Sequence, residues 1–152
     1  MKNNGFLHLV SLVAALLLAL PTTAQNESIV TLSGNAYITS GHTAFIDEDQ
    51  SAVRNWNDKE TVISFYFRTE KSGDMNIALQ AKGNSKIEVS LLGKKKKITL
   101  ESDELSHIEL GTFKVENPGY VKMDIRGLKI NQGADFGSIA SVTVGGDVCP
   151  VV

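Results

Sequence analysis

The stretch that decides the fold is TVISFYFRTEKSGDMNIALQA, which runs from Thr61 to Ala81. Apolar and polar residues alternate on both sides of the turn sequence EKSGD. Because successive side chains of a strand point to opposite faces, each half has one apolar row and one polar row. The pattern predicts an antiparallel hairpin with one buried face. The apolar row consists of Ile63, Phe65, Phe67, Met75, Ile77 and Leu79.

Similar short runs, broken by glycine, asparagine, aspartate and proline, continue to the end of the chain. Residues 85–102 predict a second hairpin that turns at Gly93, followed by a polar link at residues 102–106. The apolar spacing slips at Gly111, which indicates a bulge. Together the runs predict an all-β fold, a two-sheet antiparallel sandwich of jelly-roll type with roughly eight to nine strands.

The first 24 residues have the pattern of a secretory signal peptide. Lys2 precedes an apolar run from Phe6 to Leu20, and the small-residue ending PTTAQ predicts cleavage after Ala24. The run is too short for a membrane span of about 20 residues, so we expect a secreted or periplasmic protein without a membrane span. Residues 25–146 are expected to form one domain. Residues 147–152 form a tail, interpreted either as the end of a stand-alone module or as a truncated link to a further domain.

Charge and cysteine content restrict the possible partners and chemistry. Beyond Ala24 the chain has 14 basic residues against 17 acidic ones, a formal charge of −3, which argues against nucleic acid as the partner. The run Lys94–Lys97 is interpreted as a solvated hairpin tip that discourages edge pairing, with an anionic polymer as the alternative. The single cysteine, Cys149, excludes an intrachain disulfide, and its context gives no reason to expect a reactive thiol.

An acidic cluster supplies candidate metal ligands. Asp47 and Asp49 carry the hard oxygen atoms that Ca²⁺ prefers, and Asp135 would join them if a metal linked the first and last strands. The alternative is an acidic turn between strands. His42 and His107 have no zinc-ligand spacing. We therefore expect no cofactor other than a structural calcium ion.

Aromatic residues in polar surroundings are the candidate ligand-binding groups. Trp56 lies in a polar loop, and Tyr66 lies in the outward row of a strand. A flat exposed ring suits the apolar face of a sugar, and the planar groups of Arg68 and Gln80 suit its hydroxyls. The alternative is that Trp56 closes one end of the sandwich and Tyr66 packs under a loop. No convergent acid–base motif is present, so we do not expect an enzyme.

Several motifs in order carry a resemblance to a known group of proteins. They are NW at residues 55–56, EKSGDMNIAL, LGTFKV, PGYVKMDIRG and GADFGSI. Over residues 29–146 the chain resembles β-sandwich carbohydrate-binding modules with a galactose-binding-like fold. It is more closely similar to the uncharacterised domain that precedes a larger domain of unknown function in exported bacterial proteins.

The resemblance implies a non-catalytic module that binds a polysaccharide or oligosaccharide, in some members with a structural calcium ion. It places the sugar either in loops at one end, at Trp56, Asn57 and Asp58, or on a sheet face. The face option points to Tyr66, Arg68 and Gln80. The alternative is a structural or protein-interaction module that packs against a second domain or partner.

Overall fold

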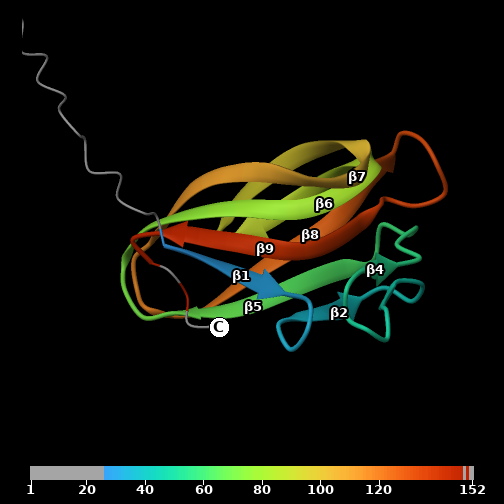
Figure 1. Cartoon of the computed structure of the whole chain (residues 1–152). Helices are drawn as coiled ribbons and strands as arrows, with labels where there is room; N and C mark the ends of the chain where they lie inside the picture. Colours follow the sequence, from blue (N-terminus) through green and yellow to red (C-terminus); the bar gives the residue numbers. More distant parts are fainter. Residues whose placement is uncertain (1–25, 149, 151–152) are drawn as a thin grey trace, which may run out of the picture.

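The computed structural model describes residues 26–148 and 150, and these residues form β-strands and loops (Figure 1). The predicted signal peptide, residues 1–24, and Cys149 lie outside the described residues. No helix in the described part is long and apolar enough to cross a membrane. The predicted all-β class and strand number are confirmed. The nine described strands are β1 (Glu27–Thr31), β2 (Ala36–Ser40), β3 (Phe45–Ile46), β4 (Val53–Arg54), β5 (Val62–Thr69), β6 (Gly73–Leu91), β7 (Lys94–Val115), β8 (Gly119–Ile130) and β9 (Ser138–Gly146).

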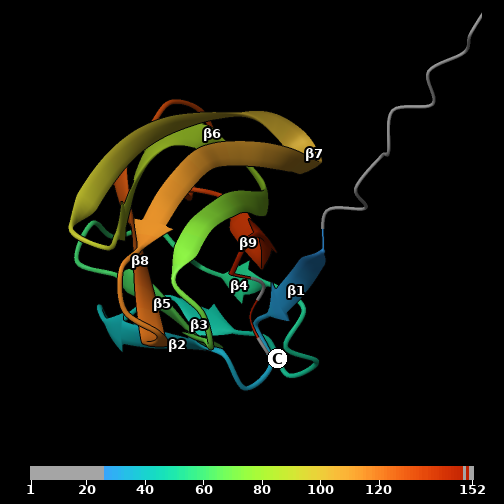
Figure 2. The same ribbon diagram turned by 90° about the vertical axis from the view of Figure 1, so that its left-hand side faces the viewer.

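The strands form two layers that share the long strands β6 and β7. The first half of β6 pairs with β9, which pairs in turn with β1. The second half of β6 pairs with β8, and the order continues through β5 to β2. Strand β7 pairs with β6 along both halves, and β3 and β4 form a small separate sheet. Figure 2 shows β6 and β7 curving over the interior, with β9 and β1 on one side and β8, β5 and β2 on the other.

Strand β6 passes from one layer to the other where two glycines meet. Gly83, with a φ of 151°, lies against Gly137, the residue just before β9. A Cβ atom added to Gly83 would lie 2.9 Å from the Cα atom of Gly137, and one added to Gly137 would overlap the Lys82 carbonyl. Neither position therefore has room for a side chain, and the crossing depends on glycine at both.

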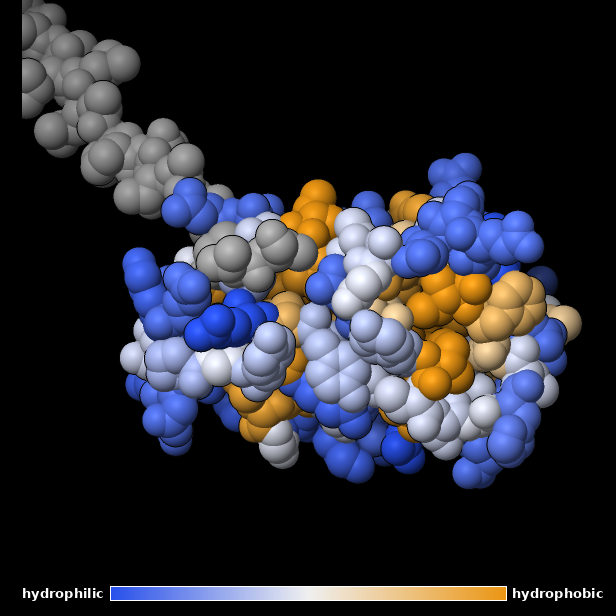
Figure 3. All heavy atoms as spheres, turned by 90° about the horizontal axis from the view of Figure 1, so that it is seen from below, coloured by the Kyte–Doolittle hydropathy of each residue, from blue (hydrophilic) through white to orange (hydrophobic). Residues whose placement is uncertain are grey.

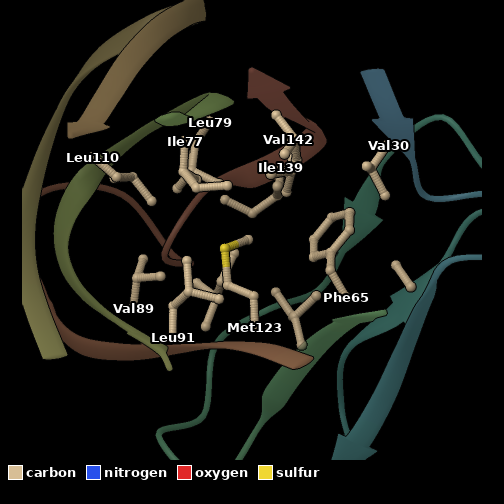
Figure 4. Packing of buried hydrophobic residues seen from close by; sticks show 14 of the residues in the cluster. Val30, Phe65, Ile77, Leu79, Val89, Leu91, Leu110, Met123, Ile139 and Val142 are labelled. Atoms are coloured by element: carbon tan, nitrogen blue, oxygen red, sulfur yellow. The ribbon is translucent and has the colours of Figure 1, made fainter. Parts of the chain in front are cut away.

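The predicted apolar row forms part of a single core. All six of its side chains, from Ile63 to Leu79, are buried in one cluster. Figure 4 shows Phe65, Ile77 and Leu79 within it. The predicted hairpin is nevertheless wrong, because β5 pairs with β8 and β2 rather than with β6. The link at residues 70–72 crosses between layers, so the two apolar rows face each other. Alternation specifies the face that a residue occupies, but it does not specify the neighbouring strand.

The hairpin predicted at residues 85–102 is confirmed, with Leu91 opposite Lys94 across the turn. The polar link expected at residues 102–106 is wrong, because β7 continues through it. The bulge at Gly111 is confirmed: Ile77 lies opposite Gly111, and the next residue of β6 lies opposite Glu109. Within the tail, Val148 is buried and the Asp147 amide donates to the Asp74 carbonyl at 2.8 Å, so these residues pack against the domain.

Gly127 provides a test of the core packing at the crossing. A Cβ atom there would overlap the Phe136 ring. We expect Gly127→Ala to lower the free energy of unfolding by about 1–3 kcal/mol, because the ring must move. In a Phe136→Ala background the same substitution should cost much less, since the obstructing ring is gone. Urea unfolding of the four proteins measures both costs, and simple additivity would contradict the packing described here.

Candidate functional site: an exposed tyrosine groove

Trp56 is a core residue, so the predicted exposed ring is wrong. Its side chain is 0% exposed, and its ring centroid lies 5.4 Å from that of Phe136. The Trp56 carbonyl also accepts a hydrogen bond from the Phe136 amide at 2.8 Å. The loops at residues 41–60 and 131–137 lie at the same end of the sandwich (Figure 1). The two rings cover the apolar interior there, which is the alternative considered for Trp56.

The two residues that follow Trp56 belong to the same loop. The Asp58 carboxylate accepts hydrogen bonds from the Thr61 amide at 2.6 Å and the Thr61 hydroxyl at 3.0 Å. It also accepts one from the Thr43 hydroxyl, which is the main reason that its pKa is lowered. Asn57 donates to the side chain of Asn55 at 3.1 Å. These contacts hold the loop before β5 in place.

Of the predicted calcium ligands, Asp47 and Asp49 lie in one turn, where the Ser51 hydroxyl contacts both. Asp47 accepts hydrogen bonds from the backbone amides of Ser51 and Ala52 at 2.8 and 2.9 Å, and it pairs with Arg54 at 3.1 Å. Asp49 accepts from the Ser51 hydroxyl, whereas Asp135 accepts from an amide in its own loop. Within residues 26–148 and 150, no group of three or more His, Cys, Asp or Glu side chains could hold a metal ion. The acidic cluster is a hydrogen-bonded turn.

Tyr66 and Arg68, by contrast, lie together on the outer face of β5, in an open groove of about 700 Å³. Tyr37 on β2 meets Tyr66 edge to face, with ring centroids 5.9 Å apart. Tyr120 on β8 lies directly across from Arg68 and is 83% exposed. We call this surface the tyrosine groove. Its lining residues are Gly34, Asn35, Tyr37, Tyr66, Phe67, Arg68, Glu70 and Tyr120.

Hydrogen bonds and charges fix the shape of the groove. The Tyr37 hydroxyl donates to the Gly34 carbonyl at 3.3 Å, which holds that ring against the loop before β2. Lys122, opposite Tyr66 on β8, lies 6.0 Å from the Tyr66 ring centroid. A hydrogen bond from Lys122 to Asp124 raises the Lys122 pKa, so the ammonium stays charged near neutral pH. The groove therefore combines exposed aromatic rings with a fixed positive charge.

Gln80 is not part of this groove. It lies on β6 opposite Ser141 of β9 and His107 of β7, in the other layer. A shallow trough of about 270 Å³ lies in that region, lined by polar residues that include Asn76, Glu109 and Thr143. The predicted sheet-face site therefore divides between the two layers, and only Tyr66 and Arg68 stay together.

A third hollow, of about 310 Å³, lies at the Trp56 end. Most of its polar lining is already engaged, because Arg54 pairs with Asp47 and Asp103 accepts from Asn84 at 2.8 Å. The Ser138 hydroxyl in this lining is buried, and in the described part of the chain it has no hydrogen-bond partner. We call this hollow the end pocket.

Sequence reasoning missed Tyr37 and Tyr120. Each ring is next to a core residue in the sequence: Ala36 precedes Tyr37, and Val121 follows Tyr120. Because side chains alternate along a strand, the outward direction of both rings could be inferred. The sequence gives no sign that β2, β5 and β8 are neighbours. That pairing is what brings the two rings beside Tyr66.

Comparison with protein families identifies the group to which the chain belongs. The model of the family described as "Domain of unknown function (DUF5077)" matches residues 30–149. The chain is therefore a member of this family. Among curated proteins, no match to the chain was found.

Solved structures share the fold at low sequence identity. A family 35 carbohydrate-binding module from Clostridium thermocellum has a TM-score of 0.60 and 11% identity, covering 78% of this chain and 98% of that one. A Podospora anserina GH26-CBM35 β-(1,4)-mannanase has a TM-score of 0.58 and 12% identity, covering 83% of this chain but only 28% of that one. The insecticidal crystal protein Cry2Aa has a TM-score of 0.63 and 15% identity. The match covers 82% of this chain and 22% of that one. These likenesses show the fold alone.

The burial of Trp56, the only tryptophan, can be tested directly. We expect Trp56→Ala to lower the free energy of unfolding by about 3–5 kcal/mol, because the substitution leaves a large cavity. Tyr120→Ala, on the surface, should change it by less than about 0.5 kcal/mol. Urea unfolding measures both values. A Trp56→Ala protein as stable as the parent, or ready quenching of the parent's indole fluorescence by acrylamide, would contradict the buried position.

The turn at Asp47 predicts an acid-shifted titration. The amide of Ala52 is the main cause that lowers the pKa of Asp47 from 3.8 to about 2. Because the folded pKa lies below the unfolded one, Asp47 stabilises the fold above about pH 4. That contribution is lost as the pH falls through about 2. Carboxyl ¹³C NMR should give a midpoint near 2 for Asp47, and a midpoint near 3.8 would show that the turn is not formed as described.

Proposed function

We propose that the protein is a non-catalytic glycan-binding module whose binding site is the tyrosine groove. One observation carries the proposal: three tyrosine side chains from three neighbouring strands meet at an open surface beside Arg68. Aromatic rings pack against the apolar faces of sugar rings, while charged and polar groups at their edges hydrogen-bond to hydroxyls.

The groove provides both kinds of contact. Tyr37 and Tyr120 are 53% and 83% exposed, so each ring has a free face for stacking. Arg68 and Glu70 are exposed at the same groove and supply a donor fork and a carboxylate acceptor. An open groove competes with water for each contact, so a single site binds weakly. Several modules on one polymer would bind more tightly through multivalency.

Two further observations support a glycan over a large protein partner. The fold is shared with proteins named as carbohydrate-binding modules, including the one from Clostridium thermocellum. On the face seen in Figure 3, apolar residues reach the surface as separate patches among polar ones, whereas protein interfaces usually have a larger continuous patch. The signal-peptide pattern of residues 1–24 supports export, which would bring the module to extracellular polysaccharides.

Substitution of the exposed rings tests this proposal. We expect Tyr37→Ala and Tyr120→Ala each to weaken polysaccharide binding about tenfold, or roughly 1.4 kcal/mol, because each removes one stacking surface. Leu105→Ala is the matched control, since Leu105 is 51% exposed on β7 and does not line the groove. Affinity electrophoresis against a panel of neutral and acidic polysaccharides measures the change. Binding that survives both tyrosine substitutions would place the site elsewhere, and binding to no polysaccharide would reject the function.

A further inference from the structure

We propose that the ligand of this module is an acidic polysaccharide, and that the tyrosine groove is one end of a wider basic face that binds it. The inference rests on the proposed function and adds the charge of the glycan to it. The basic face is the outer surface of β5, β8, the second half of β6 and the first half of β7. Its cationic residues are Arg68, Lys86, Lys95, Lys97, Lys122, Arg126 and Lys129.

Strand register aligns these cations on one surface. Arg126 on β8 lies across from Glu88 on β6, which lies across from Lys97 on β7. In the next outward row, Asp124 on β8 lies across from Ser90 on β6, and Ser90 lies across from Lys95 on β7. The inward neighbours of these residues are core side chains such as Ile125 and Val89, so the row itself must face outward.

The two carboxylates in these rows lie beneath the cations. The Glu88 side chain is 13% exposed, whereas that of its partner Lys95 is 67% exposed. The Asp124 side chain is 29% exposed, whereas that of its partner Lys122 is 47% exposed. Two more carboxylates, Glu70 at the groove and Glu101 on β7, are exposed on the same face. The cations still outnumber the carboxylates, so the net charge of the face is positive.

The remaining five cations have no ion-pair partner among the described residues. They are Arg68, Lys86, Lys97, Arg126 and Lys129. Neighbouring strands lie about 4.8 Å apart, so cations directly opposite each other, such as Lys86 and Lys129, are close enough for their fields to overlap within the Debye length of about 8 Å. Arg68 lies further along the sheet, because its partner Tyr120 is six residues from Arg126 on β8. A polymer that spans several sugar units is therefore needed to contact both ends of the face.

The positive face does not follow from the overall composition, because the chain has a formal charge of −2. The outward rows of the opposite layer carry Glu27, Asp74 and Glu109, with Lys82 and Lys114 as the basic residues among them. The fold thus separates charge between its two faces. A uniformly acidic surface would repel a polyanion. Because the positive charge is concentrated on one face, a polyanion is attracted to that face.

The four-lysine run contributes only half of its charges to this face. Lys94 and Lys96 lie opposite the buried residues Leu91 and Val89, on the inward row at the open edge of the sandwich. The Lys96 ammonium donates to the Leu110 carbonyl and lies 5.8 Å from the Phe113 ring centroid. Lys95 and Lys97 are the two that face outward. Inward lysines at an edge discourage pairing with another strand, as expected for this run.

The pattern of rings and charges suits sugar units that each carry an anionic group. Tyr66 lies opposite Lys122, and Arg68 lies opposite Tyr120, so aromatic and cationic groups alternate across the two strands. A sugar stacked on a ring would place its carboxylate or sulfate near a neighbouring cation. The Arg68 guanidinium presents a fork that can bind either anion through two hydrogen bonds.

The test compares polysaccharides that differ in charge. We expect the purified protein to bind polygalacturonate or dextran sulfate, which carry carboxylate and sulfate respectively, at least tenfold more tightly than neutral dextran or galactan. Binding should weaken several-fold between 50 and 300 mM NaCl, roughly as for other polyanion ligands. The stronger of the two acidic ligands identifies the anionic group. Binding to neutral polysaccharide alone, lost in Tyr120→Ala, would overturn the acidic ligand and leave the glycan-binding proposal intact.

A matched pair of double variants locates the charge effect. Lys97→Gln with Arg126→Gln should weaken acidic polysaccharide binding about tenfold. Lys82→Gln with Lys114→Gln removes the same net charge from the opposite layer and should leave the affinity within about twofold. Equal losses in the two variants would overturn the inference. Binding of polyglutamate or single-stranded DNA with equal affinity would also overturn the inference, because the face would then recognise charge without recognising sugar. No binding to any polysaccharide would reject the proposed function itself.

Discussion

The whole structure depends on the contact between two backbones at Gly83 and Gly137. Their approach leaves no room for a Cβ atom on either residue, and it marks the point where β6 passes from one layer to the other. Ser85, just beyond the crossing, donates to the Phe136 carbonyl at 2.6 Å inside the protein. Phe136 in turn packs against Trp56. One close approach therefore connects the central strand, the last strand and the loop that closes the end of the sandwich.

This crossing also gives the two outer faces different chemistry. Each half of β6 has its own neighbours, so the outward residues of one continuous strand belong to two surfaces. On one surface the neighbours are β8 and β5, which bring tyrosines and cations together. On the other they are β9 and β1, and polar and acidic side chains such as Glu27, Glu109 and Thr143 surround the small Ala78 there. We infer that ligand binding belongs to the first surface, because exposed tyrosine rings meet a cluster of cations there.

The sequence predicts the layers better than it predicts their arrangement. Alternation assigned Ile63, Phe65 and Met75 to the core correctly, because a face is a local property of a strand. It did not predict that β5 pairs with β8, because strand pairing depends on contacts between distant residues. The same limit explains the site. Tyr66 could be selected as an outward ring, whereas its neighbours Tyr37 and Tyr120 come from other strands. Trp56 was misassigned because a polar loop can still fold over an open core.

Mapping of a bound oligosaccharide by NMR tests the central claim most directly. In a titration of the ¹⁵N-labelled protein with an oligogalacturonate, the account predicts that the largest amide shifts occur at Tyr37, Tyr66, Arg68, Tyr120 and Lys122. Amides around Ala78 in the opposite layer, and around Ser138 in the end pocket, should change little. Shifts concentrated at Ser138 or Ala78, with the tyrosine groove unaffected, would contradict the account.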